Sequence, residues 1–309
     1  MLEFHNPLYM LREYRGAVLL GVGCALWCIF NVHFAFGLLL FLSGVPIFFS
    51  YLSYGQKSGF ISAFIATIIP FAFVPIEISI DVFLNIILPS SMVGHLALRN
   101  IVKNRKKWWY PESFLLNNFV ILFSFVMIIM SFTLRTEESI TKIYEEAVKI
   151  IFSENANFYI SGAGQNLRSV IKYYEGIATF YNMLATILNL HIAYALGRKF
   201  KTNIRISFDM INITISNWLA VMPLVALTLS KMLPSLAYVF CGLFVVGLFA
   251  PALGGFSVIG FIIKKRKMRR APLFITALVI IFPLHIMTLV ALLGIVDSFY
   301  PIRKQMAGV

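Results

Sequence analysis

Nine stretches of mostly apolar residues, separated by short polar loops, extend from Ala17 to Phe299. A bilayer has about 30 Å of hydrocarbon, so a helix needs roughly 20 apolar residues to cross it. With 60% hydrophobic and 13% charged residues, a soluble core could not bury this much apolar surface. The sequence predicts an all-α, polytopic transmembrane helical bundle of about eight or nine spans, forming a single integral membrane domain over residues 1–309. The expected spans are 16–33, 34–53, 58–76, 79–98, 113–134, 173–196, 209–230, 235–263 and 271–298.

The basic residues predict how these spans are oriented. The net charge is +13, yet Lys and Arg gather in alternate loops, which is typical of membrane topology and not of nucleic-acid binding. A cytoplasmic N-terminus places 18 of the 26 basic residues inside, with the loops 99–112, 199–208 and 264–270 in the cytoplasm. An odd number of spans then leaves Arg303 and Lys304 outside. Alternatively, the last segment is re-entrant, with Pro283 near its middle.

The loop 135–172 is expected to be extracytoplasmic and to contain an amphipathic helix. Its apolar residues recur at helical spacing and fall on one face: Ile140, Ile143, Tyr144, Ala147, Ile150 and Ile151. Such a helix lies on the membrane surface or packs over the spans. A lid above a solute site is the alternative.

The chain contains no recognised catalytic or metal-binding motif. The five histidines are scattered without a His-Glu-x-x-His spacing, and the three cysteines have neither disulfide nor zinc spacing. The segment 55–58 (Gly-Gln-Lys-Ser) lacks the order and the preceding strand of a phosphate-binding loop. We therefore expect a protein that is not an enzyme and that has no metal, cofactor or catalytic residues.

Polar residues at membrane depth are the candidates for function, because they are costly unless they face protein or water. One stripe follows the sixth expected span at intervals of three and four residues: Glu175, Thr179, Asn182, Thr186 and Asn189. The next span offers Asn212 and Asn217 as a partner surface. Two interpretations stay open, interhelical hydrogen bonding and a path for a solute.

A second polar group lies near the expected outer ends of the spans. Asn31 and His33 fall between the first two spans, and Glu77 and Asp81 lie around the turn between the third and fourth. They are candidates for the outer mouth of a solute path. Solvation of the loops explains them equally well.

Several short segments resemble one family. They are 292–299 (Leu-Leu-Gly-Ile-Val-Asp-Ser-Phe) followed by Arg303, 254–259 (Gly-Gly-Phe-Ser-Val-Ile), 42–48 (Leu-Ser-Gly-Val-Pro-Ile-Phe) and 109–111 (Trp-Tyr-Pro). They are similar to the YybS-like family of bacterial polytopic membrane proteins, in its alphaproteobacterial branch. The resemblance implies a distant relationship to the S components of energy-coupling-factor transporters and to the cell-shape protein MreD.

The resemblance implies a multi-pass protein of the bacterial cytoplasmic (inner) membrane with one of two functions. The first is an S-component-like subunit that binds or transports a small solute. The alternative is an MreD-like scaffold that binds a membrane-protein partner in envelope assembly. Ala17, Gly21 and Ala25, spaced by four, resemble the small-residue surface by which S components dock, although packing inside the bundle is the alternative. The expected partners are the lipid bilayer, a membrane protein and a small solute, and no nucleic acid.

Overall fold

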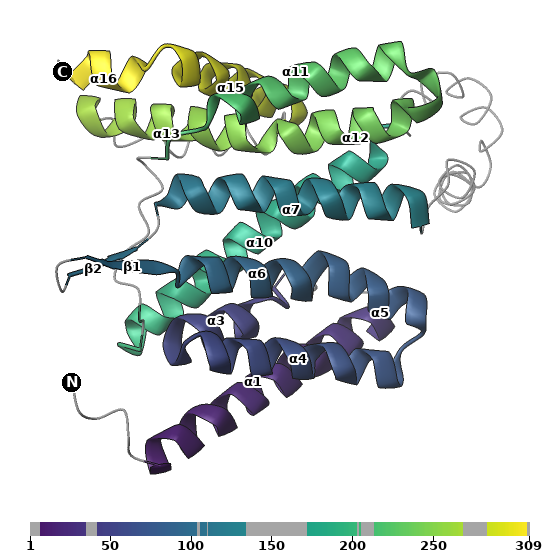
Figure 1. The fold of residues 1–309 in the computed structure, drawn as a ribbon, viewed down its shortest axis with the longest axis vertical. Helices are drawn as coiled ribbons and strands as arrows, with labels where there is room; N and C mark the ends of the chain where they lie inside the picture. Colours follow the sequence, from purple (N-terminus) through teal and green to yellow (C-terminus); the bar gives the residue numbers. More distant parts are fainter. Residues whose placement is uncertain are drawn as a thin grey trace. The chain divides into compact units, whose positions relative to one another are not determined.

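The computed structural model describes residues 7–34, 42–103, 106–109, 111–133, 172–202, 204, 213–267 and 283–307. These residues form helices and one short β-hairpin, which confirms the predicted helical membrane bundle (Figure 1). The chain divides into two compact units. Unit 1 comprises 1–115 and 181–208, and unit 2 comprises 116–180 and 209–309. Whether they act as a single membrane domain stays a prediction.

The described helices match the membrane expectation in length and composition. Within the described residues, five helical stretches are long and apolar enough to cross a membrane: Gln56–Phe73, Ile76–Ala97, Glu112–Phe132, Tyr174–Lys199 and Pro234–Arg266. Shorter apolar helices lie at Tyr14–Phe30, Val45–Tyr54, Asn217–Met232 and Ile286–Phe299. The expected extracytoplasmic helix lies outside the described residues, which include only residue 172 of the loop 135–172.

Unit 1 begins with α1 (Pro7–Phe34), α3 (Val45–Tyr54) and α4 (Gln56–Phe73). Of the second expected span, 34–53, residues 35–41 lie outside the described part, 42–44 form a turn, and the rest is the ten-residue α3. Gly55 separates α3 from α4 with a positive φ of 95°, a conformation that glycine adopts without steric cost. Exposed aromatic residues on α4, including Phe60 and Phe64, suit contact with lipid.

The next stretch of unit 1 is helical but irregular. It consists of α5 (Ile76–Val82), a π-helical turn η2 (Phe83–Ile87) and α6 (Leu88–Ala97). The Leu88 N–H donates to the Phe83 carbonyl, five residues back, which is the π pattern. Pro89 has no N–H to donate to the Asn85 carbonyl, which explains why the regular ladder is interrupted here.

The basic loop 99–112 contains a β-hairpin that the sequence analysis did not predict. Strands β1 (Asn100–Lys103) and β2 (Lys106–Trp109) pair antiparallel, with Ile101 opposite Trp108. Branched and aromatic residues favour such strands. Beyond it lie α7 (Glu112–Thr133) and α10 (Tyr174–Lys199), each of which contributes residues to both units.

Unit 2 contains α11 (Asn217–Met232), a 3₁₀ turn η3 (Pro234–Leu236) and α12 (Ala237–Gly247). The expected span 209–230 is corrected, because residues 213–216 are not helical and α11 begins at Asn217. Ser216 is extended, with φ −69° and ψ 139°, and its hydroxyl accepts from Asn117 Nδ2 at 2.7 Å.

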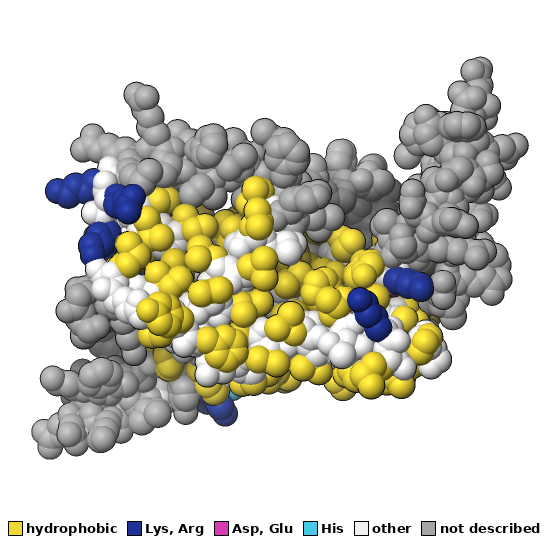
Figure 2. Space-filling model, turned by 90° about the horizontal axis from the view of Figure 1, so that it is seen from above, with side chains coloured by type: hydrophobic (Ala, Val, Ile, Leu, Met, Phe, Trp, Pro, Cys, Tyr) yellow, Lys and Arg dark blue, Asp and Glu magenta, His cyan; other side chains and the backbone are white. Residues whose placement is uncertain are grey.

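The remaining helices of unit 2 are α13 (Phe249–Arg266), α15 (Pro283–Phe299) and α16 (Ile302–Ala307). The break between α12 and α13 lies at Leu248, because Pro251 cannot donate to the Gly247 carbonyl. At the closest approach of α13 and α15, a Cβ added at Gly255 or Gly294 would meet backbone atoms of the other helix. On the face of the molecule in Figure 2, hydrophobic side chains cover most of the described surface, and Lys and Arg lie toward its edges.

Contacts in unit 2 show that α13 and α15 run in the same direction. Gly254 approaches Gly294, Ser257 is linked to Asp297 through Arg303, and further along Lys265 Nζ donates to the Met306 carbonyl. Residue numbers therefore rise together along the pair. Residues 271–282 of the expected span 271–298 lie outside the described part, and its described part is α15, which is parallel to α13. The choice between a single crossing and a re-entrant segment stays a prediction.

Candidate functional site

Helix α10 places the predicted polar stripe in the interior. Glu175, Thr179, Thr186 and Asn189 are buried, and Asn182 is half-buried, as the spacing predicts. Glu175 and Thr179 belong to unit 2, whereas the other three belong to unit 1. In unit 2, a Cβ at Gly176, beside Glu175, would lie 2.7 Å from the Gly242 backbone, so α10 packs closely on α12 there.

In unit 1, the stripe meets polar residues of the α5–η2–α6 stretch. Asn182 Nδ2 donates to Asn85 Oδ1 at 2.8 Å, and Asn85 Nδ2 donates to Asp81 Oδ1 at 2.9 Å. Asn85 lies inside the π turn, one helical turn after Asp81. Thr186 Oγ1 donates to the Asn182 carbonyl at 2.8 Å, as Thr side chains in helices commonly do. We call Asp81, Asn85 and Asn182 the amide chain.

Asn189 continues the stripe two turns beyond Asn182, beside Gly44 and Ser90. A Cβ added at Gly44 would lie 2.5 Å from Ser90 Oγ and 2.8 Å from Asn189 Nδ2, so only glycine leaves room for both groups. Asn189 is 4% exposed. Its Oδ1 has no hydrogen-bond partner among the described residues. Unit 1 therefore holds a buried acceptor two helical turns, about 10 Å, beyond Asn182 on the same face of α10.

The other candidates are not brought into this cluster. Glu77 is exposed, although Asp81, its neighbour one turn later, belongs to the amide chain. Asn31 and His33 lie in α1, but their side chains are outside the described part, as is the whole of Asn212. Asn217 is exposed at the start of α11.

The small-residue strip of α1 lies inside unit 1. Ala17, Gly21 and Ala25 are buried, and a Cβ added at Gly21 would lie 2.6 Å from the Ser62 carbonyl oxygen of α4. The strip lets two helix backbones approach closely, as small residues do in membrane bundles. It therefore forms internal packing and not an external docking face, which corrects the docking interpretation.

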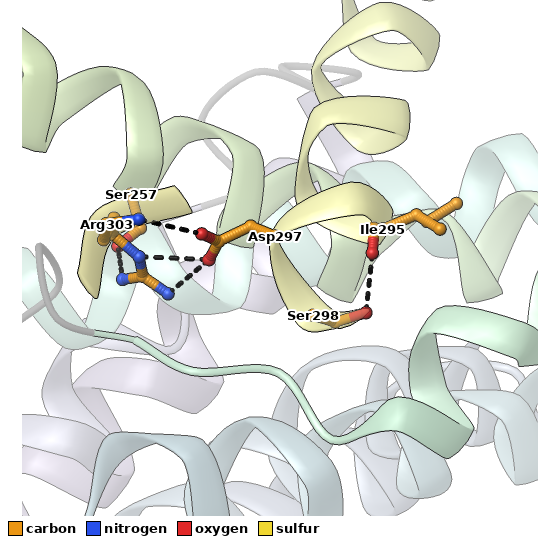
Figure 3. A network of polar contacts seen from close by, with 5 residues as sticks. All are labelled: Ser257, Ile295, Asp297, Ser298 and Arg303. Carbon is orange, nitrogen blue, oxygen red and sulfur yellow. Dashed lines mark hydrogen bonds and ion pairs between the residues drawn. The ribbon is translucent and has the colours of Figure 1, made fainter. Parts of the chain in front are cut away.

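The sequence analysis missed a charged cluster at the end of unit 2 (Figure 3). Asp297 of α15 is 7% exposed and accepts from Arg303 Nε at 3.0 Å and from Arg303 Nη2 at 2.7 Å. Arg303 Nη1 donates to Ser257 Oγ of α13 at 2.8 Å. The cluster ties α13, α15 and α16 together. In the sequence, the acidic and the basic residue of this cluster lie six positions apart, on either side of Pro301. This spacing does not place them on one face of a single helix, so periodicity does not predict the pair.

The chemistry of these sites is that of hydrogen bonding. Among the described residues, no group of three or more His, Cys, Asp or Glu side chains could hold a metal ion. The amide chain offers one carboxylate, two amides and neighbouring hydroxyl groups. Such groups can select a polar solute or hold helices together.

The fold and the buried polar residues define a polytopic helical membrane protein. The chain belongs to the family described as predicted membrane protein (DUF2232), whose model matches residues 25–298. No curated protein and no solved structure matches the chain. Family membership thus supports the membrane location, and the role of the amide chain has to be inferred from its geometry.

Proposed function

We propose that this protein binds a small polar solute at the amide chain of unit 1 and takes part in its transport across the bacterial inner membrane. The observation that supports this most strongly is the buried Asn189 Oδ1, which has no partner among the described residues. A buried polar group left without a partner costs about 1–3 kcal/mol. An interhelical hydrogen bond in a membrane contributes about 0.6 kcal/mol on average. A solute that donates a hydrogen bond to Asn189 Oδ1 would remove this cost.

The π turn at 83–87 supports the same proposal. π-bulges in α-helices frequently occur at functional sites, and this one places Asn85 between Asp81 and Asn182. The resemblance to the YybS-like family, and through it to transporter S components, favours a solute-binding subunit. The MreD-like scaffold is the competing function, and it assigns no solute to these residues.

Vesicles containing the full chain test the proposal. They are incubated with a soluble metabolite extract, washed, and analysed by mass spectrometry for retained compounds. Asn182→Leu should lose at least one compound that the wild-type protein retains, because the variant removes the donor to Asn85. Thr228→Val is the matched control, since Thr228 is an exposed polar residue of α11 that donates to the Leu224 carbonyl.

The outcomes separate the two functions. Retention that depends on Asn182 but not on Thr228 supports solute binding. If wild-type and Asn182→Leu vesicles retain the same compounds, and both variants co-purify the same membrane proteins, the solute proposal fails and the scaffold is favoured. A measurement of thermal unfolding in detergent shows that the variants remain folded.

A further inference from the structure

We propose that the end of α13 binds the phosphate headgroups of anionic phospholipids. The binding group consists of Lys264, Arg266 and Lys267, which we call the α13 cations. This inference goes beyond the proposed function, because it concerns unit 2 and a lipid instead of the solute site of unit 1. It follows from the charge balance of unit 2 and from the level of these residues relative to the bilayer.

Helix α13 ends in a run of basic residues, 264–267, whose side chains are all exposed. One of them has a partner in the protein, since Lys265 Nζ donates to the Met306 carbonyl of α16. The α13 cations form no ion pair among the described residues. Neighbouring positive charges are therefore available to a ligand at this helix end.

The described acidic residues of unit 2, Glu175 and Asp297, do not balance these charges. Asp297 accepts hydrogen bonds from Arg303, which neutralises it. The residue after Glu175 packs against Gly242 of α12. Lys264 lies roughly 30 Å further along α12 and α13, whose junction keeps helical backbone angles. The helix macrodipole supplies only about half a negative charge at the end of α13, so an excess of positive charge remains.

The neighbouring helix α15 shows at which level of the bilayer this charge lies. A Cβ added at Gly254 would lie 3.7 Å from Gly294 Cα, and the two helices are parallel, so the end of α15 lies slightly before the end of α13. Phe299 and Tyr300 are exposed there, and tyrosine is typical of the membrane–water interface. Lys264 lies about one helical turn, roughly 6 Å, further out. The headgroup layer extends about 5–8 Å beyond the hydrocarbon, so the α13 cations lie at the level of the phosphates.

A phospholipid fits this surface better than free phosphate or an acidic protein segment. Lysine and arginine donate charge-assisted hydrogen bonds to phosphate oxygens. Helix α15 also exposes an apolar stripe at helical spacing that leads to the same end of the unit: Leu289, Leu292, Val296 and Phe299. An acyl chain can lie along this stripe while its headgroup contacts the α13 cations, whereas free phosphate would leave the stripe unused.

Native mass spectrometry of the purified full chain in detergent tests the ligand class. Dioleoyl phosphatidylglycerol should bind at least about tenfold more tightly than dioleoyl phosphatidylcholine, which has the same acyl chains and no net charge. Inorganic phosphate at equal concentration should not displace the bound phosphatidylglycerol. Equal affinity for the two lipids overturns the inference. Displacement by phosphate would show a free-phosphate site, and binding of a polyglutamate peptide in place of the lipid would show a site for acidic protein; either result overturns the lipid assignment.

Lys264→Gln/Arg266→Gln tests the location of the site. Each basic residue near an anionic lipid surface strengthens binding about fivefold, so this variant should bind phosphatidylglycerol at least about tenfold more weakly. Lys172→Gln/Lys231→Gln is the matched control, because it removes two exposed charges of the same unit at the ends of other helices. It should leave binding unchanged. Equal weakening in both variants would indicate a general charge effect and would contradict the inference.

Lys264→Arg/Arg266→Lys separates the effect of charge from that of a damaged helix end. This exchange keeps both positive charges and should retain the preference for phosphatidylglycerol. Thermal unfolding in the same detergent shows that each variant remains folded. A folded exchange variant that binds phosphatidylglycerol as weakly as the glutamine variant would show that charge does not determine binding, and the inference would fail.

Discussion

At the scale of single residues, glycines decide where the helices of unit 1 can meet. Gly21 and Gly23 lie on the same helix and differ in their surroundings. A Cβ at Gly21 would be 2.6 Å from a backbone oxygen of α4, whereas at Gly23 no atom lies within 4 Å. The difference between the two positions is thus one of packing and not of helix propensity.

This pair gives a matched test of the packing of α1 on α4. Gly21→Ala should lower the stability by about 1–3 kcal/mol, because the backbone of α4 has to move to accept the methyl group. Gly23→Ala should cause no loss. Thermal unfolding of the two variants in the same detergent checks this. Similar midpoints for both would show that the strip is not a close contact.

The cluster of Asp297, Arg303 and Ser257 makes a second prediction at this scale. Removal of one partner of a buried ion pair costs about 3–5 kcal/mol, since the other charge is left without compensation. Asp297→Leu should therefore destabilise strongly, and the double variant Asp297→Leu/Arg303→Met should recover much of the loss. Gln305→Ala, at an exposed position of α16, is the control. A double variant as unstable as Asp297→Leu would contradict the prediction.

The same scale shows what could be predicted of the candidate site. Periodicity along one helix identified the stripe on α10, because buried polar residues recur at helical spacing. It could not identify Asn85 as the partner of Asn182, since the two are 97 positions apart and the π turn that presents Asn85 leaves no periodic trace. Pro89 was the available signal for that irregularity.

At the scale of elements, apolar length predicted most helices and misplaced some of their ends. The segment 213–216 alternates apolar and polar residues (Ile-Thr-Ile-Ser), which is the period of extended chain, yet its hydrophobicity placed it in a span. The β-hairpin was missed for a related reason, because the basic residues of 99–107 read as a topology signal. Hydropathy measures how long an apolar segment is, and it does not report the local backbone conformation.

Across the whole molecule, the parallel pair of α13 and α15 predicts that α16 shares a side of the membrane with the basic end of α13. Lys267→Cys and Gln305→Cys, each in a background without Cys24, Cys28 and Cys241, should react with an impermeant thiol reagent from the same side. We expect that side to be the cytoplasm, because Lys264–Lys267 are basic. Lys231→Cys, at the end of α11, is expected to react from the opposite side. Labelling of positions 267 and 305 from different sides would contradict the parallel arrangement.

The direction of this pair also has a consequence for the order of assembly. Antiparallel neighbours can associate as soon as the second helix follows the first through a short turn. Parallel neighbours cannot, because the connection between two parallel helices has to return to the side from which the first helix started. Membrane helices insert first and associate afterwards, and pairing between distant segments is slow. The close contact at Gly255 and Gly294 is therefore a late event in folding, and until it forms, the pair of Asp297 and Arg303 lacks the Ser257 hydroxyl of α13.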